Sequence, residues 1–104
     1  MKVLYNVTVK IDHSVHDEWL SWMTAVHIPD VMATGCFESY TMNRIIGDND
    51  EHGQGYAIQY TARNMQEFQR YNTDYAPSLQ KAHAERYRDM YVAFRTLMEI
   101  VEQG

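Results

Sequence analysis

Alternation of apolar and polar side chains is the feature that most constrains this chain. Between residues 2 and 11, every second side chain is apolar: Val3, Tyr5, Val7, Val9 and Ile11. A period of two is typical of a strand that buries one of its faces. The same period returns in residues 37–46, 56–62 and 88–101, so the sequence predicts four strands.

Two stretches with helical spacing lie between these strands. The first is expected to open at Ser14, which forms a capping-box pattern with Asp17, and to close at Gly35. The second is expected to begin at a cap on Asn64 and to bend at Pro77, near residues 73–76. The polar, glycine-rich residues 47–55 predict a long loop between the second and third strands.

A proline interrupts the first helix. Pro29 has no N–H for the carbonyl of Ala25, and a residue that precedes proline is pushed out of the helical region. That residue is Ile28, so we expect the helix to kink or restart at His27–Ile28. A histidine beside such a defect can face a cavity and meet free backbone groups.

The predicted order is strand, helix, strand, strand, helix, strand. This order is that of the ferredoxin-like α+β sandwich, in which a four-stranded antiparallel sheet carries two helices on one face. The length of 104 residues suits one domain over residues 1–104. Repeats, linkers and low-complexity segments are absent from the sequence.

Composition excludes several classes of function. The net charge is −5, with 14 acidic against 9 basic residues, so we expect no binding to nucleic acid. Cys36 is the only cysteine and is expected to be a buried filler, which rules out an internal disulfide. The sequence has neither a signal peptide pattern nor a transmembrane stretch, and we expect a cytoplasmic protein.

Two helices cover only one face of such a sheet, so the other face needs a partner. We expect bulky apolar groups on both faces: Val7, Val9 and Ile11 on one, and Leu4, Tyr40, Met42 and Leu97 on the other. This predicts a homodimer through the open sheet face. Alternation alone leaves open which set faces the helices. The candidates for lining a ligand cavity on the mixed face are Asn6, Thr8, Tyr40, Arg44, Gln59 and Arg95.

Short motifs along nearly the whole chain resemble the bacterial family called domain of unknown function 4286. They are His27-Ile28-Pro29-Asp30-Val31, Ala33-Thr34-Gly35, Tyr56-Ala57-Ile58-Gln59-Tyr60, Tyr75-Ala76-Pro77-Ser78-Leu79 with His83, and Val92-Ala93-Phe94-Arg95-Thr96-Leu97. The resemblance implies a member of the dimeric α/β-barrel superfamily, hence a ferredoxin-like protomer and a homodimer. That superfamily includes cofactor-free monooxygenases, isomerases, stress-response dimers and haem-degrading enzymes.

Two histidines in these motifs, His27 and His83, are the candidate catalytic residues. Imidazole titrates near neutral pH and suits proton transfer or ligand binding. The alternative is that each ring satisfies backbone carbonyls freed by Pro29 or Pro77. Arg44 and Arg95 are candidates for capture of a ligand carboxylate, or they pair across strands with Glu38 and Glu99.

Metal and haem chemistry have weaker support. His13 and His16, with Asp12 and Asp17, offer metal ligands only at an exposed helix start, so we expect no metal site and no cofactor. Haem-degrading relatives combine a strand-one asparagine with a histidine and a tryptophan on the second helix. Asn6 and His83 fit that pattern loosely, but both tryptophans, Trp19 and Trp22, lie on the first helix.

Three functions remain open at this point. The first is a homodimer of unknown function with a small-molecule pocket between the sheet and the helices or the partner. The second is a cofactor-independent monooxygenase or isomerase that uses His27 or His83 as acid and base. The third is a purely structural dimer, which predicts complete filling between the two sheets.

Overall fold

The computed structural model describes residues 1–104 and contains one four-stranded sheet. Its strands are β1 (Val3–Ile11), β2 (Ser39–Asp50), β3 (Gly53–Ala62) and β4 (Tyr91–Glu99). They lie in the order β2-β3-β1-β4, and all neighbouring pairs are antiparallel. The predicted ferredoxin-like topology is confirmed.

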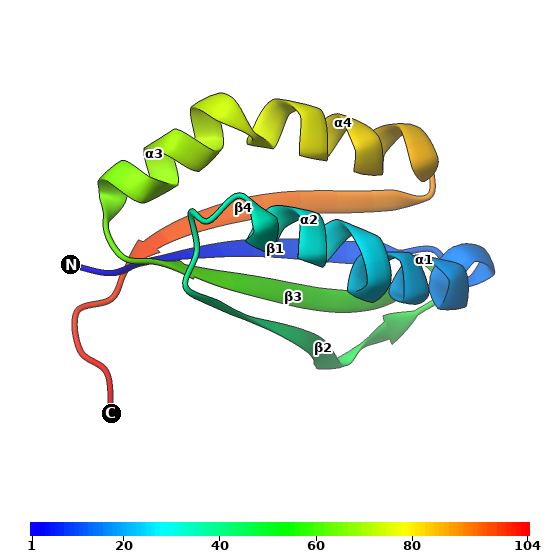
Figure 1. Ribbon diagram of the computed structural model, residues 1–104. Coiled ribbons are helices and arrows are strands. Elements are labelled where there is room, and N and C mark those ends of the chain that lie inside the picture. The colour runs from blue at the N-terminus through cyan, green and yellow to red at the C-terminus, as the bar shows by residue number, and fades with distance from the viewer.

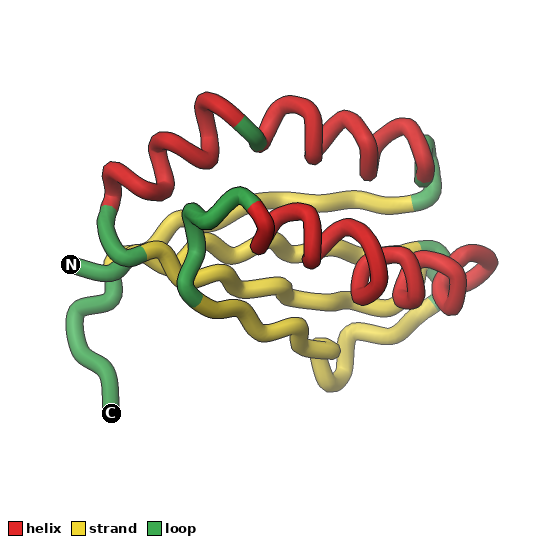
Figure 2. Tube along the Cα trace, in the orientation of Figure 1, coloured by secondary structure: helices red, strands yellow, loops and turns green.

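The helices lie on one side of the sheet (Figures 1 and 2). A 3₁₀ turn (His13–Val15), α1 (His16–Trp22), a π-helical turn (Met23–His27) and α2 (Ile28–Ala33) follow β1. The second helical segment, which follows β3, consists of α3 (Met65–Asp74) and α4 (Ala76–Arg86). The two helices are divided at Tyr75, two residues before Pro77, within the range where the sequence predicts a bend. None of these helices combines the length and apolar character that crossing a membrane requires.

Strand register decides which residues face the helices. Residues paired across antiparallel strands point to the same side of a sheet. Tyr5 pairs with Tyr60 and with Leu97, and Tyr5 and Tyr60 are both buried in the core under the helices. The odd-numbered residues of β1 and β4 and the even-numbered residues of β3 therefore form the helix-facing side.

One predicted grouping of apolar residues is wrong. Tyr40 pairs with Tyr60 and Met42 with Ile58, so both lie on the helix-facing side, as does Leu97. Leu4 does lie on the outer face, as predicted, but the other apolar residues of that face are Val92, Phe94 and Met98 of β4. Val92 and Phe94 are 70% and 63% exposed. The open face is therefore apolar along the β4 edge, whereas its β2 and β3 half carries Ser39, Thr41, Asn43, Gln59 and Thr61.

The first helix accommodates Pro29 differently from the expectation. Ile28 keeps helical angles (φ −62°, ψ −44°) and is not pushed out of the helical region. The helix instead widens one turn earlier, where the N–H of Ile28 donates to the carbonyl of Met23, five residues back. This π-helical turn spans residues 23–27 and ends at His27, so the defect does fall where the sequence placed it.

Of the two predicted helix caps, the structure contains the one at Asn64 but not the one at Ser14. The Asn64 side chain accepts a hydrogen bond from the N–H of Glu67, as expected. Ser14 does not cap the first segment, because it donates its own N–H and hydroxyl to the carboxylate of Asp12. Asp12 is therefore the capping residue.

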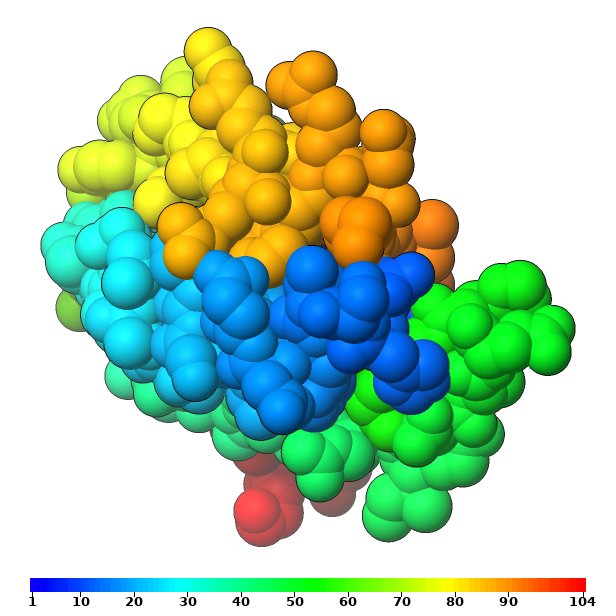
Figure 3. Space-filling model, turned by 90° about the vertical axis from the view of Figure 1, so that its right-hand side faces the viewer, coloured from blue at the N-terminus to red at the C-terminus, as the bar shows by residue number.

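The predicted loop over residues 47–55 is wrong, because β2 continues to Asp50 and β3 begins at Gly53. The register between β2 and β3 shifts between Arg44 and Asn49, so the polar residues of this stretch lie in an irregular part of β2. Lys10 of β1 forms ion pairs with Asp48 and Asp50, each at 2.8 Å, which fastens this hairpin to the sheet. In Figure 3 the hairpin projects beside the end of the molecule formed by the α1 and α4 segments.

Two glycines of this hairpin give a matched test. Gly53 has φ +138°, and a Cβ there would lie 2.1 Å from the backbone oxygen of Ile11. Gly47 also has positive φ, but its surroundings are open. We expect Gly47→Ala to lower the free energy of unfolding by about 1 kcal/mol and Gly53→Ala by clearly more, about 2 kcal/mol or above, in urea denaturation. Equal effects of the two substitutions would contradict this close approach of β3 to β1.

Candidate functional site: a pocket between helices and sheet

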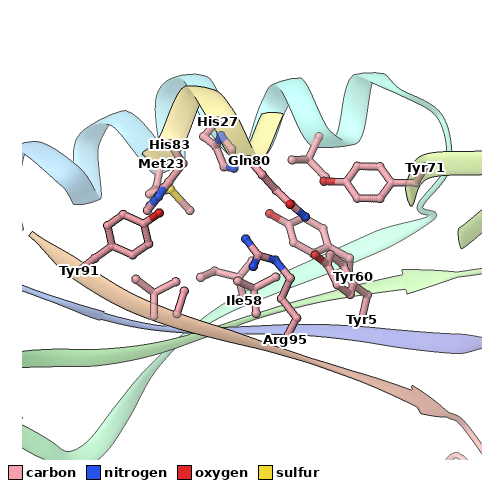
Figure 4. Close-up of a pocket in the computed structure, with 14 residues that line it drawn as sticks. Tyr5, Met23, His27, Ile58, Tyr60, Tyr71, Gln80, His83, Tyr91 and Arg95 are labelled. Atoms are coloured by element: carbon pink, nitrogen blue, oxygen red, sulfur yellow. The ribbon is translucent and has the colours of Figure 1, made fainter. Parts of the chain in front are cut away.

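A cavity of about 40 Å³ lies between the helices and the sheet (Figure 4). Ten of its 14 lining residues are hydrophobic, and four of those are tyrosines. The other lining residues are His27, Gln80, His83 and Arg95. Since no carboxylate lines the cavity, its polar lining consists of one cation, two imidazoles, one amide and tyrosine hydroxyls. A volume of this size accommodates about three water molecules or a small polar group.

The π-helical turn places His27 in this cavity. Met23, His27 and Val31 follow one another at intervals of four residues, and all three line the cavity. The His27 ring stacks on Trp22, with centroids 4.9 Å apart and planes 25° apart. Neither nitrogen of His27 has a hydrogen-bond partner within the chain, so its ring does not satisfy a carbonyl freed by Pro29.

His83 reaches the same cavity from α4. It is 8% exposed, and its Nε2 accepts a hydrogen bond of 2.9 Å from Nε1 of Trp19. The rings of His83 and Tyr91 are perpendicular, with centroids 4.4 Å apart, and the centroids of the His83 and His27 rings are 5.7 Å apart. The sequence interpretation in which His83 satisfies backbone carbonyls does not match this geometry.

Both histidines are held in the neutral form. Burial lowers the pKa of His83 to about 4, and the neighbouring His27 and Arg95 act in the same direction. Burial also lowers the pKa of His27, reinforced by Arg95 and opposed by the carboxylate of Asp30. Two uncharged imidazoles therefore face the cavity at neutral pH.

Arg95 is the only charged residue of the cavity wall. It pairs with Val7 in the strand register, so its side chain lies on the helix-facing side. Figure 4 shows its guanidinium reaching from β4 toward the helices. The chain offers it no ion pair: Glu38 bonds to Lys2 instead, at 2.5 Å, and Glu99 forms none. A guanidinium without a carboxylate partner beside a cavity is suited to an anion.

Tyrosines close the cavity near Arg95. Burial raises the pKa of Tyr5, Tyr60 and Tyr71, although Arg95 and Gln80 oppose this for Tyr5. These phenols are thus neutral at neutral pH, and each keeps a proton to donate. The cavity therefore presents several hydrogen-bond donors beside its one cation.

The other predicted ligand-binding residues lie outside this cavity. Asn6 and Gln59 face each other on the open side of the sheet, where Asn6 donates to the hydroxyl of Thr8 at 2.9 Å. Tyr40 is 48% exposed on the outer strand. Arg44 lies over the ring of Tyr56 and donates to its hydroxyl at 3.2 Å. Of the predicted set, the structure brings together His27, His83 and Arg95, and any role of the others in binding stays a prediction.

The structure also separates the residues that resembled a haem-degrading pattern. Asn6 lies on the open face and His83 on the helix-covered face, so the sheet stands between them. No group of three or more histidine, cysteine or acidic side chains is arranged to hold a metal ion. His13 bonds instead to the carbonyl of Asp50 at 2.7 Å, and His16 to the hydroxyl of Tyr56 at 2.6 Å. Cys36 is buried, as expected.

Sequence reasoning missed Gln80 and Trp19 as parts of the site. Gln80 was detectable, because it precedes His83 by three residues and so shares its helix face. Trp19 was not, because 64 residues separate it from His83.

A four-stranded antiparallel sheet in the order β2-β3-β1-β4, covered by helices on one face, defines the chain as a ferredoxin-like α+β protein. Within that class it belongs to the family described as domain of unknown function (DUF4286), which matches residues 2–101. No curated protein matches the sequence.

Solved structures share the fold at low identity. SnoaB from Streptomyces nogalater, described as a cofactor-independent oxygenase, has a TM-score of 0.73 at 16% identity, over 98% of this chain and 95% of SnoaB. A dimeric ferredoxin-like protein from an uncultured marine organism has a TM-score of 0.75 at 6% identity, over 100% and 98% of the chains. A MhuD variant with manganese protoporphyrin IX bound has a TM-score of 0.69 at 14% identity, over 98% and 97%.

The depressed pKa of His83 has a measurable effect on stability. Free histidine titrates at about pH 6.5, whereas folded His83 titrates at about pH 4. Between these two pH values the histidine is protonated in the unfolded chain and neutral in the folded protein. The contribution of neutral His83 to the free energy of unfolding is thus fully present above about pH 6.5. Below that pH it falls by up to about 1.4 kcal/mol per pH unit. We expect urea denaturation of His83→Gln to show a shallower loss between pH 7 and pH 5. Parallel curves for the two proteins would contradict a buried neutral His83.

Proposed function

We propose that the protein is a homodimer that binds a small organic anion in the pocket between helices and sheet. The observation that carries this proposal is Arg95, a guanidinium with no carboxylate partner on the wall of a mostly apolar cavity. A carboxylate bound there would form charge-assisted hydrogen bonds while its apolar part contacts valine and tyrosine side chains. The neutral tyrosines and Gln80 add donors around the same point.

The dimer half of the proposal rests on the open face of the sheet. Val92, Phe94 and Met98 are 70%, 63% and 39% exposed and lie on one edge of that face. Complete burial of a side chain such as valine or phenylalanine stabilises by about 1.5–3 kcal/mol, so a second copy of the chain is a fitting cover. Two of the similar solved structures are described as dimeric ferredoxin-like proteins.

A second candidate function is that of a cofactor-independent oxygenase or isomerase. The unpartnered ring of His27 supports it, because a neutral imidazole that lines a mostly apolar cavity is a suitable proton acceptor. The description of SnoaB as a cofactor-independent oxygenase adds support by analogy of fold. A purely structural dimer accounts less well for an unpaired arginine beside a cavity.

Arg95 gives the first test. Acetate and its neutral isostere acetamide are titrated into ¹⁵N-labelled protein and followed by amide chemical shifts. We expect acetate to shift the resonances of cavity residues. We expect Arg95→Met to weaken the binding of acetate at least about tenfold, because it removes a hydrogen bond to a charged group.

The matched control for that test is Arg44→Met, which removes the same charge from outside the cavity. It should leave the affinity for acetate unchanged, and acetamide should bind weakly to all three proteins. Equal affinity of acetate for the native protein and for Arg95→Met would reject the proposed anion site.

The dimer is tested by native mass spectrometry and sedimentation of freshly purified protein, which also reveal any retained ligand. We expect two copies, and we expect Phe94→Lys to yield single copies because it places a charge in the apolar part of the open face. Ile46→Lys is the control, since Ile46 is 99% exposed on β2, outside that apolar edge. A native protein found only as single copies would refute this half of the proposal.

A further inference from the structure

The contact between Trp19 and His83 fixes more than packing. An indole N–H is a donor only, and Nε1 of Trp19 lies 2.9 Å from Nε2 of His83 in a buried contact. Nε2 must therefore supply its lone pair. A neutral imidazole that accepts at Nε2 carries its single proton on Nδ1.

The neutral state of His83 follows from its surroundings. The ring is 8% exposed and has Arg95 and His27 beside it on the cavity wall, with no carboxylate among the lining residues. Burial and these two neighbours keep its pKa near 4, so the ring is uncharged at neutral pH. Trp19 itself is fully buried against Tyr56, with ring centroids 5.0 Å apart, so the indole donor has little freedom to turn away.

The Nδ1–H of His83 remains available to the cavity. Its ring forms one hydrogen bond within the chain, and that bond uses Nε2. Every buried side-chain nitrogen and oxygen in the structure has a hydrogen-bond partner, so Nδ1, which has none, is not sealed in the core. Because His83 lines the cavity, the accessible side of Nδ1–H is the cavity side.

We propose that Trp19 is a positioning residue, which holds His83 in the Nδ1–H tautomer and so makes His83 a hydrogen-bond donor to a bound anion. The same bond removes His83 as a proton acceptor, since its only lone pair already binds Trp19. Of the two histidines, only His27 retains a free lone pair. The donation to an anion rests on the proposed function, whereas the tautomer does not.

The opposite tautomer is disfavoured by the structure. With a proton on Nε2, the imidazole and the indole would direct two N–H groups at each other. The donor of Trp19, a fully buried residue, would then lose its acceptor, which is unfavourable. Free histidine in solution prefers the Nε2–H tautomer, so the assigned form is a distinctive signature.

Long-range ¹H–¹⁵N correlation NMR of ¹⁵N-labelled protein at pH 7.5 reads the tautomer of each histidine directly. His83→Gln identifies the His83 signals by their loss. We expect one species with Nδ1 protonated and Nε2 bare in the native protein. Trp19→Phe should convert His83 largely to the Nε2–H form, whereas Trp22→Phe, which removes the indole stacked on His27, should leave His83 unchanged.

The native spectrum is decisive even if Trp19→Phe fails to fold. A native His83 protonated on Nε2, or a mixture of both forms, would overturn the assignment. Saturating acetate then separates the two proposals. We expect it to shift the His83 Nδ1 resonance and, by loss of a neutral donor, to bind about three- to tenfold more weakly to Trp19→Phe. If acetate shifts no cavity resonance while Nδ1 stays protonated, the anion site fails and the tautomer stands.

Discussion

The hydrogen bond between Trp19 and His83 joins the two helical segments that cover the sheet. It crosses 64 residues of sequence and is buried, so it is one of few polar contacts that must form for the helix layer to close without an orphaned donor. An ion pair between Glu18 and Arg86, at 2.5 Å, links the same two segments at the surface. Together they set where α4 lies relative to α1, and the cavity is the space left between these helical segments and the sheet.

Pro29 has a comparable influence on the other side of the cavity. A helix that met this proline without adjustment would lose a hydrogen bond and bring the ring against the carbonyl of Ala25. The chain inserts a π-helical turn over residues 23–27 instead, which brings Met23 and His27 together over the sheet. The site is therefore built on two helix irregularities, one from Pro29 and one at Tyr75 before Pro77.

Much of the fold was readable because it is encoded locally. The alternation in residues 2–11, the cap at Asn64 and the break before Pro77 each depend on neighbouring residues only. The extent of β2 was not readable, because its glycine-rich end is held by ion pairs between Lys10 and two aspartates far along the chain. The side of the sheet taken by Tyr40 depends on its register with Tyr60, which composition does not contain. For the site, the motifs identified His27, His83 and Arg95, whereas their common cavity and the bond to Trp19 required the fold.

Phe94 and Arg95 are neighbours in sequence, yet they lie on opposite faces of β4. The even-numbered side chains of that strand lie on the outer face, and the odd-numbered ones lie on the side of the cavity. Substitutions can thus change the chemistry of one face while the side chains of the other face stay the same. A layer divided in this way gives a physical reason why proteins of 6–16% identity keep one architecture and carry different descriptions.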